Sequence, residues 1–278
     1  MSRILSVQDL SCVGKCSLSV ALPVLSVMGH ACSVLPTAVL STHTGFSNPE
    51  TVNLEEKMLP FARHWQGQGI SFNAVSCGYL ASPGQAERVE EILAMFSCPL
   101  ILDPVLGDGG SFYSRMTPAH GQALKRLFPY ARVVLPNVTE AALLTGLPYR
   151  EAGDEAYWAS LAEGLLGLGA ENVVITGISR DGGDLGWYAA DGRAARLETA
   201  PRIPGSCHGT GDLFSAVFAG AFLRGASVSA AAALAAAFVR RCLEATPAPT
   251  PLGVCFETVL PWLARQAEAL PDFSDCNG

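Results

Sequence analysis

The sequence lacks the features that membrane proteins and nucleic-acid-binding proteins usually carry. Its longest apolar stretches, around 21–27 and 230–238, fall far short of the roughly 20 residues that a membrane-spanning helix needs. Charged residues make up only 15% of the 278 residues, no run of Lys or Arg occurs, and the formal net charge is -7. We therefore expect neither a membrane nor a nucleic acid as a partner.

We also expect no secretory signal, because the first three residues lead directly into the strand-like segment 4–7. The nine cysteines form an odd set, and most of them lie within apolar segments. Cys12 and Cys16 are close in sequence but have no matching second pair, so we do not expect a zinc site. Reduced, buried thiols are typical of cytoplasmic proteins, and we expect a cytoplasmic location.

Hydrophobic residues make up 49% of the chain, and short β-rich segments alternate with longer helical ones. The segments expected to form strands are 4–7, 32–35, 73–77, 100–103, 132–135 and 173–176. The segments expected to form or contain helices are 14–29, 49–66, 83–96, 118–127, 139–144, 154–168, 211–224, 229–244 and 257–269. This alternation predicts an α/β fold whose mainly parallel central sheet is covered by helices on both faces.

The order of elements changes late in the chain. Segments 185–190 and 196–200 are joined by Asp191-Gly192, a dipeptide that favours a tight hairpin turn. We expect this late antiparallel hairpin to extend the sheet at its edge. No linker or repeat divides the sequence, so we expect a single domain over residues 1–270, followed by a flexible tail at 271–278.

The motif Gly209-Thr210-Gly211-Asp212 precedes a strongly helical segment. Its glycines allow a tight turn and a close backbone approach to a ligand, and the free N–H groups at a helix start can bind an anion. A carboxylate beside a bound phosphate is costly unless it has a task, such as accepting a proton from an attacking hydroxyl. The structural alternative is that Asp212 simply caps a helix.

Two further polar segments follow neighbouring expected strands. Asp103 begins a Gly-rich loop that includes Asp108 and that could close over a ligand. Asn137 and Glu140 have the spacing of a helix capping box, which is their structural alternative. The functional interpretation places Asp103 and Glu140 near Mg²⁺, in part through water, because this ion retains waters and binds few carboxylates.

A fourth polar cluster, 40–46, follows the second expected strand and includes His43 and Thr44. Asp9 and Tyr79 are expected at the ends of two other strands, on the same edge of the sheet. Polar groups at the carboxyl ends of several parallel strands are typical of a ligand-binding crevice.

The order of these motifs resembles that of the ribokinase superfamily and, within it, of the pyridoxal kinases. The resemblance runs from Ile4 to about Leu263. Its most specific parts are 103–108 and 209–212, and Asn137-Val138-Thr139-Glu140 resembles the magnesium-associated Asn-x-x-Glu motif of the superfamily. Segments 9–17 and 35–46 look like the bacterial branch that comprises pyridoxamine and pyridoxal kinases.

The resemblance implies a ribokinase-like three-layer sandwich that phosphorylates the 5′-hydroxymethyl group of pyridoxal, pyridoxamine or pyridoxine, with ATP as donor and Mg²⁺ as cofactor. Potassium often assists such enzymes, and homodimers are common among them. The implied roles are a base at Asp212, an anion hole at Gly209, Thr210 and Gly211, and metal binding at Asp103 and Glu140. The resemblance further implies that the nucleotide is contacted by Asn137, Thr176 and Asp108. It implies that the vitamer is contacted by Asp9, His43, Thr44 and Tyr79.

Departures from the family pattern leave the substrate open. Many pyridoxal kinases carry Ser where Asp9 stands, some carry Thr at the position of Leu135, and no cysteine occurs in the loop 107–118. His208 resembles a residue of the hydroxymethylpyrimidine kinases of thiamine metabolism, although Asp212 replaces the Cys that ends their motif. A hydroxymethylpyrimidine kinase and a non-catalytic B6- or nucleotide-binding protein are therefore the alternatives.

Overall fold

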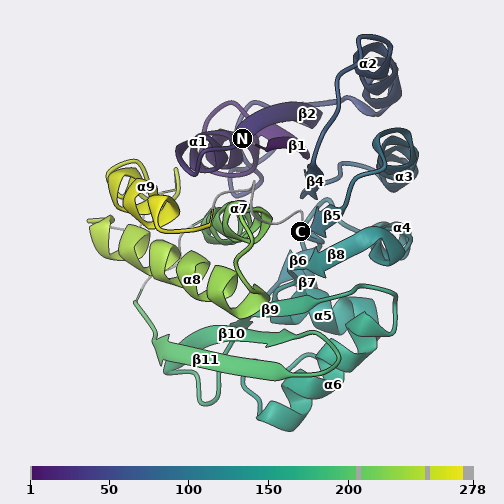
Figure 1. Ribbon diagram of the computed structural model, residues 1–278. Coiled ribbons are helices and arrows are strands. Elements are labelled where there is room, and N and C mark those ends of the chain that lie inside the picture. The colour runs from purple at the N-terminus through teal and green to yellow at the C-terminus, as the bar shows by residue number, and fades with distance from the viewer. Residues whose placement is uncertain (1, 205–207, 248–250, 272–278) are drawn as a thin grey trace.

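A computed structural model describes residues 2–204, 208–247 and 251–271. Its centre is a nine-stranded sheet of order β11-β10-β9-β8-β5-β4-β1-β2-β3. The six strands from β9 to β2 are parallel, whereas β10, β11 and β3 pair antiparallel at the two ends of the sheet. Helices cover both faces, which gives three layers (Figure 1). The predicted fold class is thereby confirmed.

The strands agree with the predicted order and differ mainly in length. Their bounds are β1 Arg3–Ser11, β2 Ala31–Leu40, β3 Thr51–Asn53, β4 Ala74–Cys77, β5 Leu100–Leu102, β6 Gly107–Asp108, β7 Ser111–Phe112, β8 Ala131–Val134, β9 Val173–Ile178, β10 Asp184–Ala190 and β11 Ala195–Pro201. The predicted late hairpin is present as β10 and β11. The short edge strand β3 and the small hairpin of β6 and β7 were not predicted, because segments of two or three residues carry no periodicity.

The helices occupy the predicted segments, and most begin or end within a few residues of the expected positions. Their bounds are α1 Leu18–Val27, α2 Glu55–Gly67, α3 Gly84–Phe96, α4 Pro118–Lys125, α5 Val138–Thr145, α6 Glu155–Leu166, α7 Thr210–Leu223, α8 Val228–Ala245 and α9 Leu260–Glu268, with a 3₁₀ turn at Phe128–Tyr130. None of these helices, within the described part of the chain, combines the length and apolar character needed to cross a bilayer.

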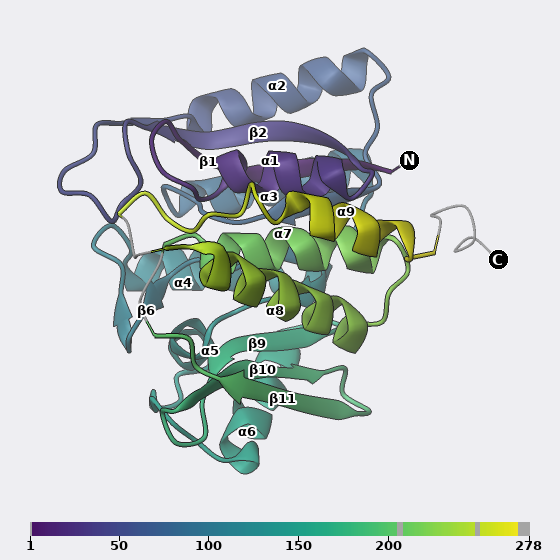
Figure 2. The same cartoon turned by 90° about the vertical axis from the view of Figure 1, so that its left-hand side faces the viewer.

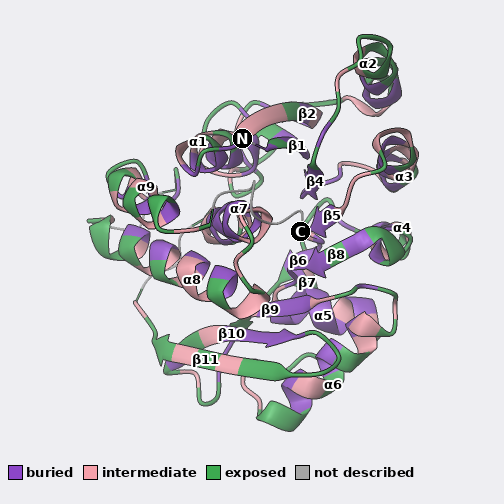
Figure 3. Cartoon of the chain, viewed as in Figure 1, coloured by how far each residue is buried: buried purple, intermediate pink, exposed green. Residues whose placement is uncertain are grey.

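Two apolar cores lie on opposite faces of the sheet. Along β5, Leu100 and Leu102 belong to the core beneath α2 to α6, whereas Ile101 belongs to the core beneath α1, α7, α8 and α9. Figure 2 shows α1, α7, α8 and α9 gathered on one face, and Figure 3 shows that the central strands are buried. Burial on both faces explains why these strands are apolar runs rather than alternating patterns.

The tail predicted at 271–278 falls outside the described residues beyond Pro271, as does Cys207, which precedes the Gly-Thr-Gly-Asp motif.

Candidate active site

A pocket of about 300 Å³ opens at the carboxyl ends of the parallel strands. All thirteen candidate site residues contribute to its lining, although they come from seven segments that lie far apart in the sequence. They are Asp9, His43, Thr44, Tyr79, Asp103, Asp108, Asn137, Glu140, Thr176, Gly209, Thr210, Gly211 and Asp212. Strand ends that meet at one edge of a sheet bring these residues together.

The start of α7 forms one wall of the pocket. Gly209 is the N-cap residue with φ 85°, and a Cβ at this position would collide with the carbonyl oxygen of Lys15. Glycine is therefore required both for the backbone conformation and for the close approach. The first turn of α7 leaves its N–H groups directed toward the pocket, where the helix dipole favours an anion.

Asp212 lies in this first turn and does not act as the N-cap, since that position belongs to Gly209. Surrounding protein atoms raise the pKa of its carboxyl to about 7, and the negative charges of Asp103 and Asp9 contribute to the increase. A hydrogen bond from the Ser17 backbone acts in the opposite direction. A carboxyl group that titrates near neutrality is well suited to accept a proton in a reaction at physiological pH.

Asp103 and Glu140 form a pair of neighbouring carboxylates on one side of the pocket. Burial raises the pKa of Asp103 to about 6, and burial together with the charge of Asp103 raises the pKa of Glu140 well above its usual range. Asp103 accepts a short hydrogen bond from the Ser215 hydroxyl. Neither carboxylate forms an ion pair with a basic side chain of the described chain, so a cation would relieve their repulsion.

The capping box predicted as the structural alternative for Glu140 is present. Its Oε2 accepts from the Asn137 N–H at 2.8 Å, and its own N–H donates to Asn137 Oδ1 at 2.9 Å. The other oxygen, Oε1, accepts from the Leu106 N–H at 3.0 Å. The Gly107 backbone also hydrogen-bonds this carboxylate, so three of its four acceptor positions are used and one remains free. The capping role and a role near a metal ion are therefore compatible in this geometry.

The Gly-rich hairpin of β6 and β7 is held over α5. The Asn137 side-chain amide donates to Gly107 O at 2.8 Å, and Gly110 N–H donates to Thr139 Oγ1 at 3.0 Å. Asp108 lies on this hairpin with its side chain exposed. Thr176, expected as the last residue of a strand, lies within β9, which extends to Ile178, and it pairs with Asn137.

Asp9 lies inside β1 rather than at its end, because the strand extends to Ser11. It is 5% exposed, and its two oxygens accept from the hydroxyls of Ser17 at 2.5 Å and Ser11 at 3.0 Å. Burial raises its pKa, and the two serine hydroxyls lower it in part. Lys15 is close to Asp9 in sequence but forms its ion pair with Glu257, at 2.8 Å. Asp9 thus holds the hydroxyl of the residue that caps α1.

His43 uses both of its ring nitrogens within the surrounding loops. Nδ1 accepts from the Gly45 N–H at 3.0 Å, so Nε2 carries the proton that it donates to Pro251 O at 2.6 Å. The ring of His208 lies 4.7 Å from that of His43, and burial lowers the pKa of His208. This arrangement fixes the shape of the pocket wall and leaves His43 only its ring surface for a ligand.

Comparison with known proteins decides the family. Residues 24–253 match the phosphomethylpyrimidine kinase family. The chain belongs to this family. It is 29% identical to the pyridoxine/pyridoxal/pyridoxamine kinase of Bordetella bronchiseptica over 272 residues, which cover 87% of this chain and 89% of the relative.

Two solved structures support the same relationship. Pyridoxal kinase from Lactobacillus plantarum superposes with a TM-score of 0.88 and 32% identity, covering 97% of this chain and 99% of its own. A provisional phosphomethylpyrimidine kinase from Bacteroides thetaiotaomicron, crystallised with pyridoxal, superposes with a TM-score of 0.89 and 31% identity. The match covers 94% of this chain and 95% of that kinase. The chain is thus a kinase of the pyridoxal and hydroxymethylpyrimidine type.

Several lining residues of this family member were not predicted. Arg115 is the one Lys or Arg side chain in the described lining, and its guanidinium donates to Pro49 O at 3.0 Å. Arg115 was not among the predicted site residues, because a single basic residue in a loop belongs to no motif. Ser17 and Ser215 donate hydrogen bonds to the carboxylates of Asp9 and Asp103, and neither serine was predicted as a site residue.

Proposed function

We propose that this kinase transfers the γ-phosphoryl group of ATP to the 5′-hydroxymethyl group of a B6 vitamer and thereby forms the 5′-phosphate. The support is the match to the Bordetella and Lactobacillus kinases over nearly the whole chain, together with the pyridoxal in the Bacteroides structure. The observation that carries the proposal is the position of Asp212, a carboxylate with a pKa of about 7 at the N-terminus of α7.

The proposed reaction requires one proton acceptor. The vitamer hydroxyl oxygen bonds to the γ-phosphorus as the bond to the bridging oxygen of ADP breaks, and the hydroxyl proton moves to the Asp212 carboxylate. The proton then leaves to solvent. Phosphoryl transfer depends on positioning and charge stabilisation more than on covalent help from the protein. The N–H groups around Gly209–Gly211 supply part of that stabilisation as hydrogen-bond donors.

The two carboxylates Asp103 and Glu140 fit a magnesium site. Both supply oxygen ligands of a kind that Mg²⁺ prefers, and a bound cation would offset the repulsion between their negative charges. The described residues contain no group of three metal-binding side chains, as suits an ion that keeps waters and uses one or two carboxylates with substrate phosphates. Bound there, Mg²⁺ would neutralise charge on the phosphates of ATP. Asn137 keeps Glu140 oriented through the capping box.

Positive charge is scarce in this pocket. Five carboxylates line it, namely Asp9, Asp103, Asp108, Glu140 and Asp212, against the single guanidinium of Arg115. A substrate as negative as ATP would therefore bind with its counter-ion rather than alone. The Arg115 charge acts on Tyr79, which supports a position near the proposed vitamer contacts.

Hydroxymethylpyrimidine is the second candidate substrate. The matched family is that of phosphomethylpyrimidine kinases, and His208, which precedes the glycine motif, packs against His43 in the pocket wall. Both substrates present a hydroxymethyl group on a nitrogen heterocycle, so Asp212 could serve either.

A panel assay separates the two candidates. ADP formation and the phosphorylated product are measured with pyridoxal, pyridoxine, pyridoxamine and hydroxymethylpyrimidine, with ATP and Mg²⁺ present. We expect the highest kcat/KM with a B6 vitamer. A preference for hydroxymethylpyrimidine would reassign the substrate, and tight vitamer binding without turnover would show a binding protein instead of a kinase.

A further inference from the structure

The loop that carries Tyr79 is fixed by side chains that lie outside the pocket. Tyr79 follows β4, and its carbonyl oxygen accepts from Thr37 Oγ1 at 2.8 Å. Two residues further on, the Ala81 N–H donates to Gln85 Oε1 at 2.8 Å. Thr37 and Gln85 are both fully buried, and neither lines the pocket.

Gln85 is the centre of this arrangement. It lies in the first turn of α3, and its Nε2 donates to Thr37 O at 2.8 Å and to Asn53 Oδ1 at 2.9 Å. Its oxygen faces an N–H and its nitrogen faces two acceptors, so the amide has only one favourable orientation. A buried amide without these partners would be costly, and the complete set of bonds makes the arrangement rigid.

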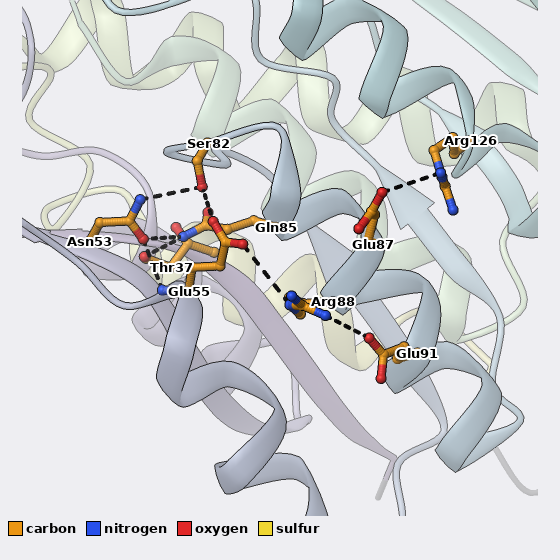
Figure 4. A network of polar contacts seen from close by, with 9 residues as sticks. All are labelled: Thr37, Asn53, Glu55, Ser82, Gln85, Glu87, Arg88, Glu91 and Arg126. Atoms are coloured by element: carbon orange, nitrogen blue, oxygen red, sulfur yellow. Dashed lines mark hydrogen bonds and ion pairs between the residues drawn. The ribbon is translucent and has the colours of Figure 1, made fainter.

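The network then continues to the protein surface (Figure 4). Asn53 Nδ2 donates to Ser82 Oγ at 3.3 Å, and Ser82 Oγ donates to Glu55 Oε2 at 2.6 Å. Glu55 approaches Arg88 at 4.0 Å, and Arg88 pairs with Glu91 at 2.9 Å. The inner bonds are shielded from solvent, whereas the outer ion pairs are half exposed and weak.

We infer that Gln85 is a positioning residue for the vitamer site, because it fixes the loop on which Tyr79 meets the substrate ring. This inference rests on the proposed role of Tyr79 in vitamer binding. Gln85 adds side-chain bonds to three segments, namely the Tyr79 loop, β2 through Thr37, and the edge strand β3 through Asn53. The nucleotide end of the pocket is built on β8, β9 and α7, to which none of these bonds extends.

The test is the Gln85→Met substitution, which keeps the length of the side chain and removes its hydrogen bonds. We expect the KM for the vitamer to rise about five- to thirtyfold, while the KM for ATP stays within about twofold. Gln66→Met, an exposed glutamine on α2, is the matched control and should change neither constant. An unchanged vitamer KM, or an equal rise in both constants, would overturn the inference.

A double-mutant cycle then shows whether Gln85 acts through Tyr79. In a Tyr79→Leu background, Gln85→Met should change the vitamer KM by no more than about twofold, because the ring that Gln85 positions has gone. If Gln85→Met raised the vitamer KM as much in the Tyr79→Leu background as in wild type, that result would contradict the inference. If Gln85→Met fails to fold, Thr37→Val replaces it, since this change removes only the hydroxyl bond to Tyr79 and keeps the side-chain shape.

This experiment remains distinct from the test of the proposed function. Should the wild-type kinase prefer hydroxymethylpyrimidine, the proposed substrate would be wrong. The same variants, assayed with that substrate, would still decide whether Gln85 positions the ring-binding loop.

Discussion

Three carboxyl groups of the pocket with raised pKa values dominate the chemistry at the scale of single residues. Asp103 and Glu140 were candidates because they follow expected strands, and Asp212 because it ends the Gly-Thr-Gly-Asp motif before a helix. Their raised pKa values could not be predicted, because they arise from the surrounding protein atoms and, for Glu140 and Asp212, from repulsion by Asp103. These groups interact, so the apparent pKa values seen in an experiment belong to the set.

The activity of the free enzyme should depend on the protonation of Asp212. Its pKa of about 7 means that the base is protonated and inactive in most molecules below that pH. We expect kcat/KM to rise with pH and to reach half of its plateau near pH 7. The pH profile of kcat/KM for the vitamer measures this directly. A flat profile between pH 5.5 and about 8 would contradict the assigned role.

The raised pKa of Asp212 also predicts that a variant without this carboxylate is more stable than wild type at neutral and higher pH. A folded-state pKa raised above the unfolded value of 3.8 adds stability that is complete below about pH 4 and is lost as the pH rises through about 7. The Asp212→Asn variant has no carboxyl group to ionise at this position, so it does not lose this stability as the pH rises. We expect its advantage over wild type in the free energy of unfolding to grow by at least about 1 kcal/mol between pH 5 and pH 8.

Thermal or denaturant unfolding of both proteins at the two pH values provides the measurement. A difference between the two proteins that does not change with pH would show that Asp212 titrates normally in the folded state.

Asp9 should influence the choice among vitamers. Its partly desolvated carboxylate faces the pocket and favours a cation or a hydroxyl donor over an aldehyde. We expect a preference for pyridoxamine or pyridoxine over pyridoxal, and Asp9→Ser should reduce that ratio about ten- to a hundredfold. The kcat/KM for the three vitamers in both proteins decides the matter.

Asp9 also has a structural role that the comparison must control. It accepts from the hydroxyl of Ser17, the residue that caps α1, so the variant should lose some thermal stability. The KM for ATP should not change. A lower Tm with an unchanged vitamer ratio would leave Asp9 with the structural role alone.

At the scale of elements, the sequence predicted long, periodic helices and buried strands better than short segments. The α5 capping box was visible in the spacing of Asn137 and Glu140 and is present in the structure. The β6–β7 hairpin was not visible, because four residues around Gly109-Gly110 carry no periodic signal. The extension of β1 past Asp9 was also missed, since polar residues inside a buried strand look like its end.

The start of α5 provides a test that separates two roles of Glu140. Glu140→Gln should raise the Mg²⁺ concentration required for the half-maximal rate, because one negative charge is lost. It should also lower stability, since an amide nitrogen would face either Leu106 N–H or Asn137 N–H. Titration of the rate with Mg²⁺, alongside Tm, distinguishes these effects. A lower Tm with an unchanged Mg²⁺ requirement would leave only the capping role.

At the scale of the whole molecule, the alternation of strands and helices was enough to predict a three-layer α/β fold and the edge at which the site lies. Residues far apart in sequence, such as Asp9 and Asp212, share one pocket because parallel strands end at the same edge. The contacts that link them, including those of Ser17 and Gln85, depend on side-chain packing between elements and were beyond prediction. The single-domain organisation over residues 1–270 remains a prediction.

The central claim is that Asp212 is the base of a kinase, and one substitution tests it most directly. Asp212→Asn preserves the shape of the side chain and removes its basicity. With a B6 vitamer and saturating ATP and Mg²⁺, we predict that kcat falls roughly 10²- to 10⁴-fold while the Kd for ATP changes little. Near-normal turnover by the correctly folded variant would contradict the account.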